Sequence, residues 1–314
     1  MSLKHVLEII VAVDSPKASG QTVRELFAQH GWDEVEVRTV QGEKGSTDFV
    51  KLTVPGRHGK SRGGTAPTLG VVGRLGGLGA RPAMIGLVSD GDGAVAALAA
   101  ALKLVDMHHL GDVLEGDVTI TTHVCPNAPT QPHDPVPFMG SPVDMAMMNA
   151  MEVTPEMDAV LSIDTTKGNR LVNHRGIAIT QPVKQGWILR LSDDLLDTYQ
   201  IVCGHAPVVL PINMQDITPY GNGVHHVNSI LQPAVATKAP VVGVAITTES
   251  MVPGCATGAS HETDIALAVR YVLEVAKSYG QGKFRFYDEQ EFQRLVALYG
   301  SMEVLQKPAR NVEG

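Results

Sequence analysis

The chain has 314 residues, of which 44% are hydrophobic and 18% charged, and its formal net charge is −8. This composition excludes a disordered chain, and it provides no basic surface of the kind that binds nucleic acid. No apolar run reaches the roughly 20 residues that a membrane helix needs, and no secretory signal is visible. Its three cysteines cannot form a disulfide framework. We therefore expect a cytoplasmic protein without nucleic-acid or membrane partners.

Helical and strand-like segments alternate along the chain. Apolar spacing predicts helices over 3–13 and 20–30, and apolar–polar alternation predicts two paired strands over 35–40 and 49–54. Short apolar runs then predict strands over 69–72, 84–88, 118–124, 159–163, 208–212 and 241–246. Apolar segments with helical spacing predict helices over 94–104, 145–151, 264–279 and 289–299.

This alternation predicts an α/β fold in three layers, with a mostly parallel, mixed sheet flanked by helices. The segment 125–142 is rich in proline and is expected to be a long loop. Because strands and helices continue to alternate on both sides of this loop, we predict a single domain over 1–314.

Side chains that bind metals or transfer protons follow several predicted strands. In parallel sheets, ligands bind beyond the carboxyl ends of the strands. The residues at these ends are Asp90, Asp92, His123, Cys125, Asp164, Asn213, Asp216, Glu249, Cys255 and His261. Each residue type also has an ordinary structural role, since aspartates cap helices, buried histidines form hydrogen bonds, and cysteines fill small spaces. As a set, carboxylates with imidazoles suit zinc or manganese, and a thiolate would favour zinc.

Several segments resemble the co-catalytic zinc aminopeptidases, including the deblocking aminopeptidases. The resemblance is carried by LKHVLEIIVAVDSPKASGQTVREL, SDGDGAVAALAAAL, VTITTHVCP, AVLSIDTTKGN and GASHETDIALAVRYV. It implies a zinc-aminopeptidase-like fold and a divalent metal, with zinc as the expected ion. By this resemblance Asp90, Asp164 and His261 would be the metal ligands.

The resemblance also suggests roles for residues around that metal. His123 stands where the family has a glutamate and would be the general base or a fourth metal ligand, and Glu262 would assist beside His261. Arg74 stands where the family has a metal-binding histidine and would hold a substrate carboxylate. Cys125 and Cys255 are further candidates for contact with the substrate.

These observations predict a metal-dependent hydrolase of a small peptide or amide, from a bacterial family of unknown function distantly related to the peptidases. Two alternatives stay open. The segment GGTAPTLGVVGRLGGLGARPAMIGLVSDGDGA resembles the ribokinase-type sugar kinases, which would place Gly63, Gly64 and Asp90 or Asp92 near a sugar. The chain could also be a non-catalytic ligand-binding protein on a peptidase-like scaffold. A homo-oligomer is expected on general grounds.

Overall fold

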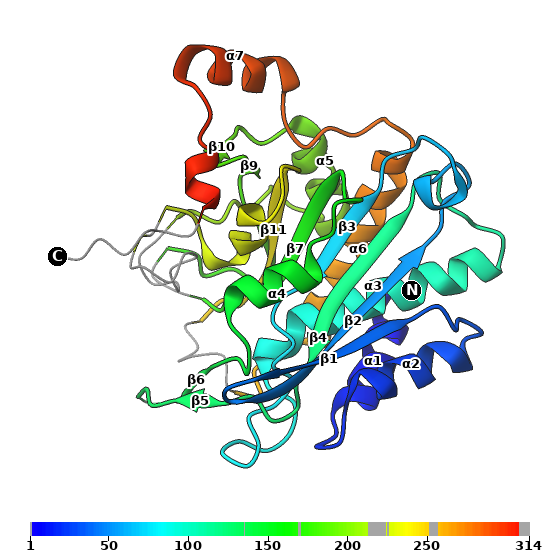
Figure 1. Ribbon diagram of the computed structural model, residues 1–314, viewed down its shortest axis with the longest axis vertical. Helices are drawn as coiled ribbons and strands as arrows, with labels where there is room; N and C mark the ends of the chain where they lie inside the picture. The colour runs from blue at the N-terminus through cyan, green and yellow to red at the C-terminus, as the bar shows by residue number, and fades with distance from the viewer. Residues whose placement is uncertain are drawn as a thin grey trace.

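A mixed β-sheet with helices on both faces forms the centre of the molecule (Figure 1). The structure, a computed structural model, describes residues 2–134, 136–168, 171–212, 224, 226–250 and 257–307. Within these ranges the sheet has nine strands in the order β1-β2-β4-β3-β7-β11-β9-β10, and β8 also pairs with β11. The α/β class and the layers of helices are thus as predicted. No helix in this part of the chain combines the length and the hydropathy needed to cross a membrane.

The strands and helices have the following bounds. The sheet consists of β1 (Glu36–Gly42), β2 (Gly45–Val54), β3 (Leu69–Gly73), β4 (Val118–Val124), β7 (Ala159–Thr165), β8 (Gly176–Ile179), β9 (Val183–Lys184), β10 (Trp187–Ile188) and β11 (Val241–Thr247). The helices are α1 (Ser2–Val13), α2 (Gly20–Gln29), α3 (Asp92–His109), α4 (Met145–Glu152), α5 (Asp193–Cys203), α6 (Glu262–Gly280) and α7 (Glu289–Tyr299). Short 3₁₀ helices include η2 (Ser89–Gly91) and η3 (Ser229–Val235).

Parallel pairing is confined to the centre of the sheet. Strand β3 pairs in parallel with β4 and β7, and β7 pairs in parallel with β11. On one side β2 joins β4 antiparallel and β1 joins β2 antiparallel, and on the other side β8 and β9 join β11 antiparallel. The sheet is therefore mixed, and the expectation of a mostly parallel sheet holds only for its four central strands.

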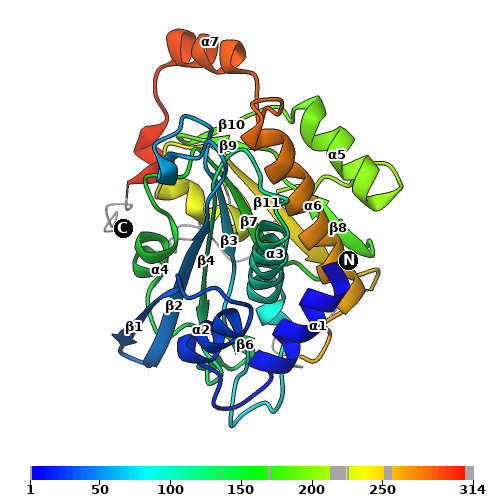
Figure 2. The same cartoon turned by 90° about the vertical axis from the view of Figure 1, so that its right-hand side faces the viewer.

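Helices α3 and α6 cover one face of the sheet, and α4 with η3 covers the other (Figure 2). Leu161 and Ile163 of β7 belong to the same buried cluster as the residues of α3 and α6. Val160, on the opposite face of the same strand, packs with Ile230 of η3. Because α3 is buried along nearly its whole length, alanine and leucine fill all of its sides rather than one stripe.

The first turn of α3 lies against the ends of two central strands. A Cβ atom on Gly93 would lie 1.8 Å from the carbonyl oxygen of Arg74 and 2.4 Å from that of Ile163. Only glycine fits there, because the clashing atoms belong to the backbone. This contact fixes the start of α3 at the carboxyl ends of β3 and β7, where the sequence places several candidate site residues.

Three sequence predictions fail in detail. Residues 84–88 form no strand, since Ile85 is 89% exposed and Gly86 has a φ of +81°. Residues 208–212 make only an isolated bridge from Val209 to Ile179. The proline-rich segment is not structureless, because it contains a small hairpin of β5 (Thr130–Gln131) and β6 (Phe138–Met139). In the first two cases the apolar run predicts a buried strand, but an apolar run does not specify a partner strand.

A polar cluster joins α1, α2 and α3 at their contact. Asp106 of α3 accepts hydrogen bonds from His5 at 2.8 Å and from Nδ1 of His30 at 3.0 Å, and His30 Nε2 lies 2.7 Å from Glu8. Burial by itself would lower the pKa of His30, but the hydrogen bonds and charges of Glu8 and Asp106 outweigh it and raise the pKa above the usual 6.5. Protonated His30 therefore stabilises the packing of the N-terminal helices.

We expect this cluster to make the stability of the protein depend on pH. Because the pKa of His30 is raised by folding, its contribution is complete below pH 6.5 and is lost as the pH rises through the folded value. The free energy of unfolding, measured by urea denaturation, should fall as the pH rises above about 6.5, and should fall less in His30→Gln. His133→Gln, at an exposed histidine, is the control. An equal pH dependence in wild type and His30→Gln would contradict the prediction.

Candidate functional site

The predicted site residues are divided between the two faces of the sheet. Asp90, in η2, precedes α3 by two residues, and His261 directly precedes α6; both helices cover the same face of the sheet. Asp164 follows Ile163, which faces α3, so the alternation of side chains turns Asp164 to the other face. Arg74 and His123 also lie on that other face, where they contact α4. The residues lie at the expected edge of the sheet but do not form one cluster.

Arg74 and His123 belong to a buried ion network with Asn149 and Glu152 of α4. Arg74 Nη1 lies 2.9 Å from Glu152 Oε2, and its Nη2 donates to Asn149 Oδ1. His123 Nδ1 lies 2.7 Å from Glu152 Oε1, and the backbone N–H of Gly76 donates to His123 Nε2 at 3.1 Å. Since Nε2 accepts from Gly76, the proton of the neutral ring is on Nδ1 and is donated to Glu152.

This network leaves neither residue free for its predicted role. Both nitrogens of His123 have partners, and the side chains of Arg74, His123 and Glu152 are 1%, 2% and 0% exposed. The geometry does not support His123 as a general base or Arg74 as a clamp for a substrate carboxylate. Glu152 was not among the predicted residues. The sequence shows a glutamate at the end of the predicted helix 145–151, but only the fold places this glutamate beside Arg74.

The cysteines do not add reactive groups to this edge. Cys125 is buried, its thiol donates weakly to the carbonyl oxygen of Ser46 at 3.7 Å, and burial raises its pKa. A thiol of this kind stays protonated at neutral pH. Cys255 lies outside the described residues, as do Asn213 and Asp216.

A second cluster, the strand-edge cluster, consists of Asp92, Lys167 and Ser260. Lys167 follows β7, and its Nζ lies 3.1 Å from Asp92 Oδ2 and 2.9 Å from the carbonyl oxygen of Ala259. Ser260 donates to the other oxygen of Asp92. The side chains of Asp92 and Lys167 are 0% and 6% exposed. Burial raises the pKa of Asp92, and the charge of Lys167 opposes this rise.

The expected metal ligands do not converge. Asp90 is 4% exposed and packs against the loop at Gly77, where a Cβ atom would lie 2.9 Å from Asp90 Oδ2. Asp164 accepts a hydrogen bond from the backbone N–H of Thr165. In the described part of the chain, no three His, Cys, Asp or Glu side chains are arranged to hold a metal ion. The described residues therefore do not fit the predicted zinc site.

The arrangement expected of a sugar kinase is also not formed. The glycine pair Gly63–Gly64 lies in a loop that is held by Asp117, immediately before β4. Asp90 and Asp92 lie beyond the carboxyl end of β3, next to α3. The two groups are thus at opposite ends of the central strands, and they cannot contact one small ligand.

A cavity of about 300 Å³, here called the edge cavity, opens between the end of β11 and the start of α6. Its lining residues are Arg175, Thr248, Glu249, Ser250, His261 and Asp264. His261 and Glu262 are exposed where α6 begins, and no side chain caps this helix. Asp264 is 2% exposed. Of the candidate residues at the strand ends that the structure describes, His261 and Glu249 line this cavity, and sequence reasoning missed Asp264 and Arg175.

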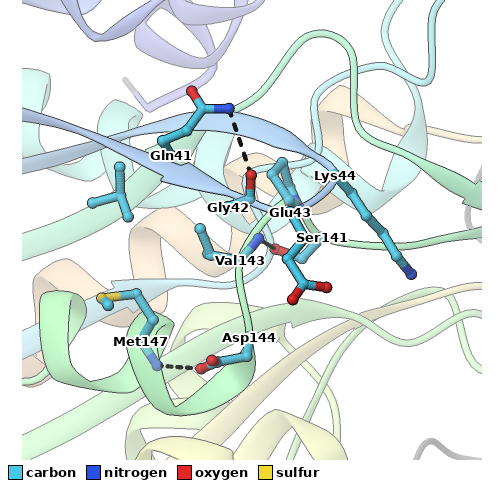
Figure 3. A pocket seen from close by; sticks show the side chains of 10 residues that line it. Gln41, Gly42, Glu43, Lys44, Ser141, Val143, Asp144 and Met147 are labelled. Atoms are coloured by element: carbon cyan, nitrogen blue, oxygen red, sulfur yellow. Dashed lines mark hydrogen bonds between the residues drawn. The ribbon is translucent and has the colours of Figure 1, made fainter.

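A larger groove of about 490 Å³ lies elsewhere, between the turn that joins β1 to β2 and the start of α4 (Figure 3). Its walls include Gln41, Glu43, Lys44 and Asp144. Asp144 accepts a hydrogen bond from the backbone N–H of Met147 at 2.8 Å and so caps α4. Because none of the predicted site residues lines this groove, the edge cavity is the better candidate for the functional site.

The structure is that of an α/β protein with a cavity at the carboxyl edge of its central strands. The chain belongs to a family described as "protein of unknown function (DUF1177)", which matches residues 38–309. The expectation of a family of unknown function is thereby confirmed, and this match carries no link to the zinc aminopeptidases. No curated protein is similar enough to count as a match.

Proposed function

We propose that this protein hydrolyses a small peptide or amide that binds in the edge cavity. The observation that carries the proposal is the exposed imidazole of His261 on the wall of a cavity at the carboxyl ends of parallel strands. Ligands of open α/β sheets bind at this edge. Imidazole is also the side chain that most often transfers protons in enzymes.

The proposed reaction uses His261 as the proton-transfer group. His261 takes a proton from a water molecule, whose oxygen forms a bond to the carbonyl carbon of the substrate. The C–N bond then breaks, and His261 returns the proton to the leaving amine. The uncapped amino end of α6 carries partial positive charge and would stabilise the oxygen that becomes negative in this step. Glu262 follows His261 in the sequence, in the first turn of α6, but the proposed reaction includes no step by Glu262.

The proposal includes no step through a metal ion. The described residues provide no set of three ligands, and Lys167 already supplies a positive charge beside Asp92. The zinc ion suggested by the resemblance stays a prediction. This prediction is tested by running every assay once with a chelator and once with added zinc. An activity that depends on zinc would require ligands that the described residues do not provide.

The deciding experiment is a hydrolysis assay with short peptides and amino-acid amides, followed by mass spectrometry. We expect turnover by the wild type and a loss of about 10²- to 10⁴-fold in His261→Ala, the range for removal of a general acid–base group. His133→Gln, at an exposed histidine on the β5–β6 hairpin side of the molecule, should leave the rate unchanged. Equal rates in wild type and His261→Ala would refute the assignment.

A second candidate function is ligand binding without catalysis. It is favoured by the observation that Asp92 and His123 are both tied to internal partners, which leaves few free groups for chemistry. In that case calorimetry would detect saturable binding of peptides or amides while the hydrolysis assay detects no product, with or without zinc.

A further inference from the structure

Asp264 has an unusual environment at the edge cavity. It is 2% exposed, yet its Oδ2 has no hydrogen-bond partner. Its Oδ1 lies 3.6 Å from Arg175 Nε and 3.5 Å from Thr263 Oγ1, so even this oxygen is held only loosely. Buried polar groups nearly always have partners, since an unpaired one loses its hydration without compensation.

The position of Asp264 in α6 explains its charge but not its unpaired oxygen. A carboxylate in the first turn of a helix is stabilised by the helix dipole, whichever side chain provides it. Stabilisation by the helix dipole does not require the carboxylate to be buried, and it does not explain why Oδ2 lacks a hydrogen-bond donor. Asp264 lines the cavity, and its buried Oδ2 has no hydrogen-bond partner within the protein, which points to a donor that arrives with a ligand.

The charges around the cavity favour a positively charged donor. Glu249 and Asp264 bring two carboxylates to its wall, and Arg175 lies 3.6 Å from Oδ1 of Asp264. The side chain of Arg175 is 65% exposed, so it can move into solvent without disturbing the core. His261 lines the same cavity, and His174 is close enough to feel the charges of Asp264 and Glu249, although burial lowers its pKa.

We propose that the edge cavity binds its ligand through a charged amino group, which displaces Arg175 and donates a hydrogen bond to Oδ2 of Asp264. An ammonium group offers three donors and suits a site with two carboxylates. A divalent metal would need more ligands than the described residues bring together. This inference deepens the proposed function and rests on its choice of site, because it assigns a free amine to the peptide or amide that binds there.

The test is a binding measurement that needs no turnover. Calorimetry and thermal shift compare dialanine and alanine amide with their N-acetylated forms, which lack the charged amine. We expect the free amines alone to bind and to raise the melting temperature. Asp264→Asn should weaken this binding about 10- to 100-fold, the range for loss of a charge-assisted hydrogen bond. Asp193→Asn, which removes an exposed acid from the first turn of α5, should bind like the wild type.

Two further readouts separate this role from a structural one. Asp264→Asn should keep the melting temperature of the unliganded protein within a few degrees, because the contacts of Asp264 Oδ1 with Arg175 and Thr263 are long and its Oδ2 has no partner to lose. Arg175→Met should strengthen amine binding by up to about 5-fold, because a weak internal competitor is lost. A ligand that binds through a carboxylate on Arg175 would show the opposite change.

Several outcomes would overturn the inference. The first is that free and acetylated compounds bind equally, and the second is that no free amine binds. The third is that Asp264→Asn binds amines as tightly as the wild type does. The fourth is that zinc or manganese chloride stabilises the protein in a way that depends on Asp264. The proposed hydrolysis can fail separately. Amine binding without product would reject only the reaction, whereas hydrolysis of acetylated substrates that depends on His261 would reject only the amine.

Discussion

Replacing Glu152 with glutamine should lower the free energy of unfolding by about 3–5 kcal/mol, the usual cost of leaving a buried charge without its partner. Glu152 is 0% exposed and neutralises Arg74, which is 1% exposed. A glutamine of the same size cannot compensate the guanidinium charge, and its amide group would place a donor where Arg74 needs an acceptor. Urea denaturation at neutral pH measures the loss.

The control for Glu152 is a glutamate in an exposed ion pair. Glu274 lies 2.7 Å from Lys277 on α6, and both side chains are more than 40% exposed. Glu274→Gln should cost at most about 0.5 kcal/mol. The double variant Arg74→Met, Glu152→Met should lose less than the sum of the single variants, since it leaves no buried charge unpaired. If Glu152→Gln were no less stable than Glu274→Gln, the buried ion network would not contribute to stability as we infer.

The second large effect is expected at Lys167. Lys167→Met leaves the fully buried carboxylate of Asp92 without its counter-ion and should also cost about 3–5 kcal/mol at neutral pH. The loss should depend on pH. Burial raises the pKa of Asp92 above 3.8, and removal of Lys167 raises it further, so the folded variant binds a proton that the unfolded chain has released. Its stability therefore falls as the pH rises above about 4.

Two measurements check this interpretation. Urea denaturation of wild type and Lys167→Met should be measured across the acidic range. The difference between their free energies of unfolding should shrink towards pH 4, where Asp92 is protonated in the variant. Adding Asp92→Asn to Lys167→Met should restore much of the lost stability, because asparagine carries no charge to desolvate. Lys277→Met, in the exposed pair, is the matched control. A loss in Lys167→Met that is independent of pH and unaffected by Asp92→Asn would indicate packing rather than charge.

Local patterns were sufficient for most of the secondary structure. The spacing in 289–299 predicts a helix with the bounds of α7, and the apolar runs at 118–124 and 159–163 mark β4 and β7. A helix satisfies its backbone hydrogen bonds within its own segment, and both of these strands pair with β3 in the sheet. Residues 84–88 have a similar composition, but they follow Pro82 and contain Gly86 at positive φ, and no strand is available to pair with them.

By itself the sequence determined that this is an α/β protein. It also identified the edge of the sheet where side chains that can bind metals or transfer protons gather. Only the tertiary structure decided which of them meet. Alternation along β7 and the burial of α3 and α4 on opposite faces send Asp164, Arg74 and His123 to one side and Asp92 and His261 to the other. Glu152 lies 78 residues along the chain from its partner Arg74, and Lys167 lies 75 residues from its partner Asp92. Their pairing depends on how helices pack across the sheet, which no local pattern encodes.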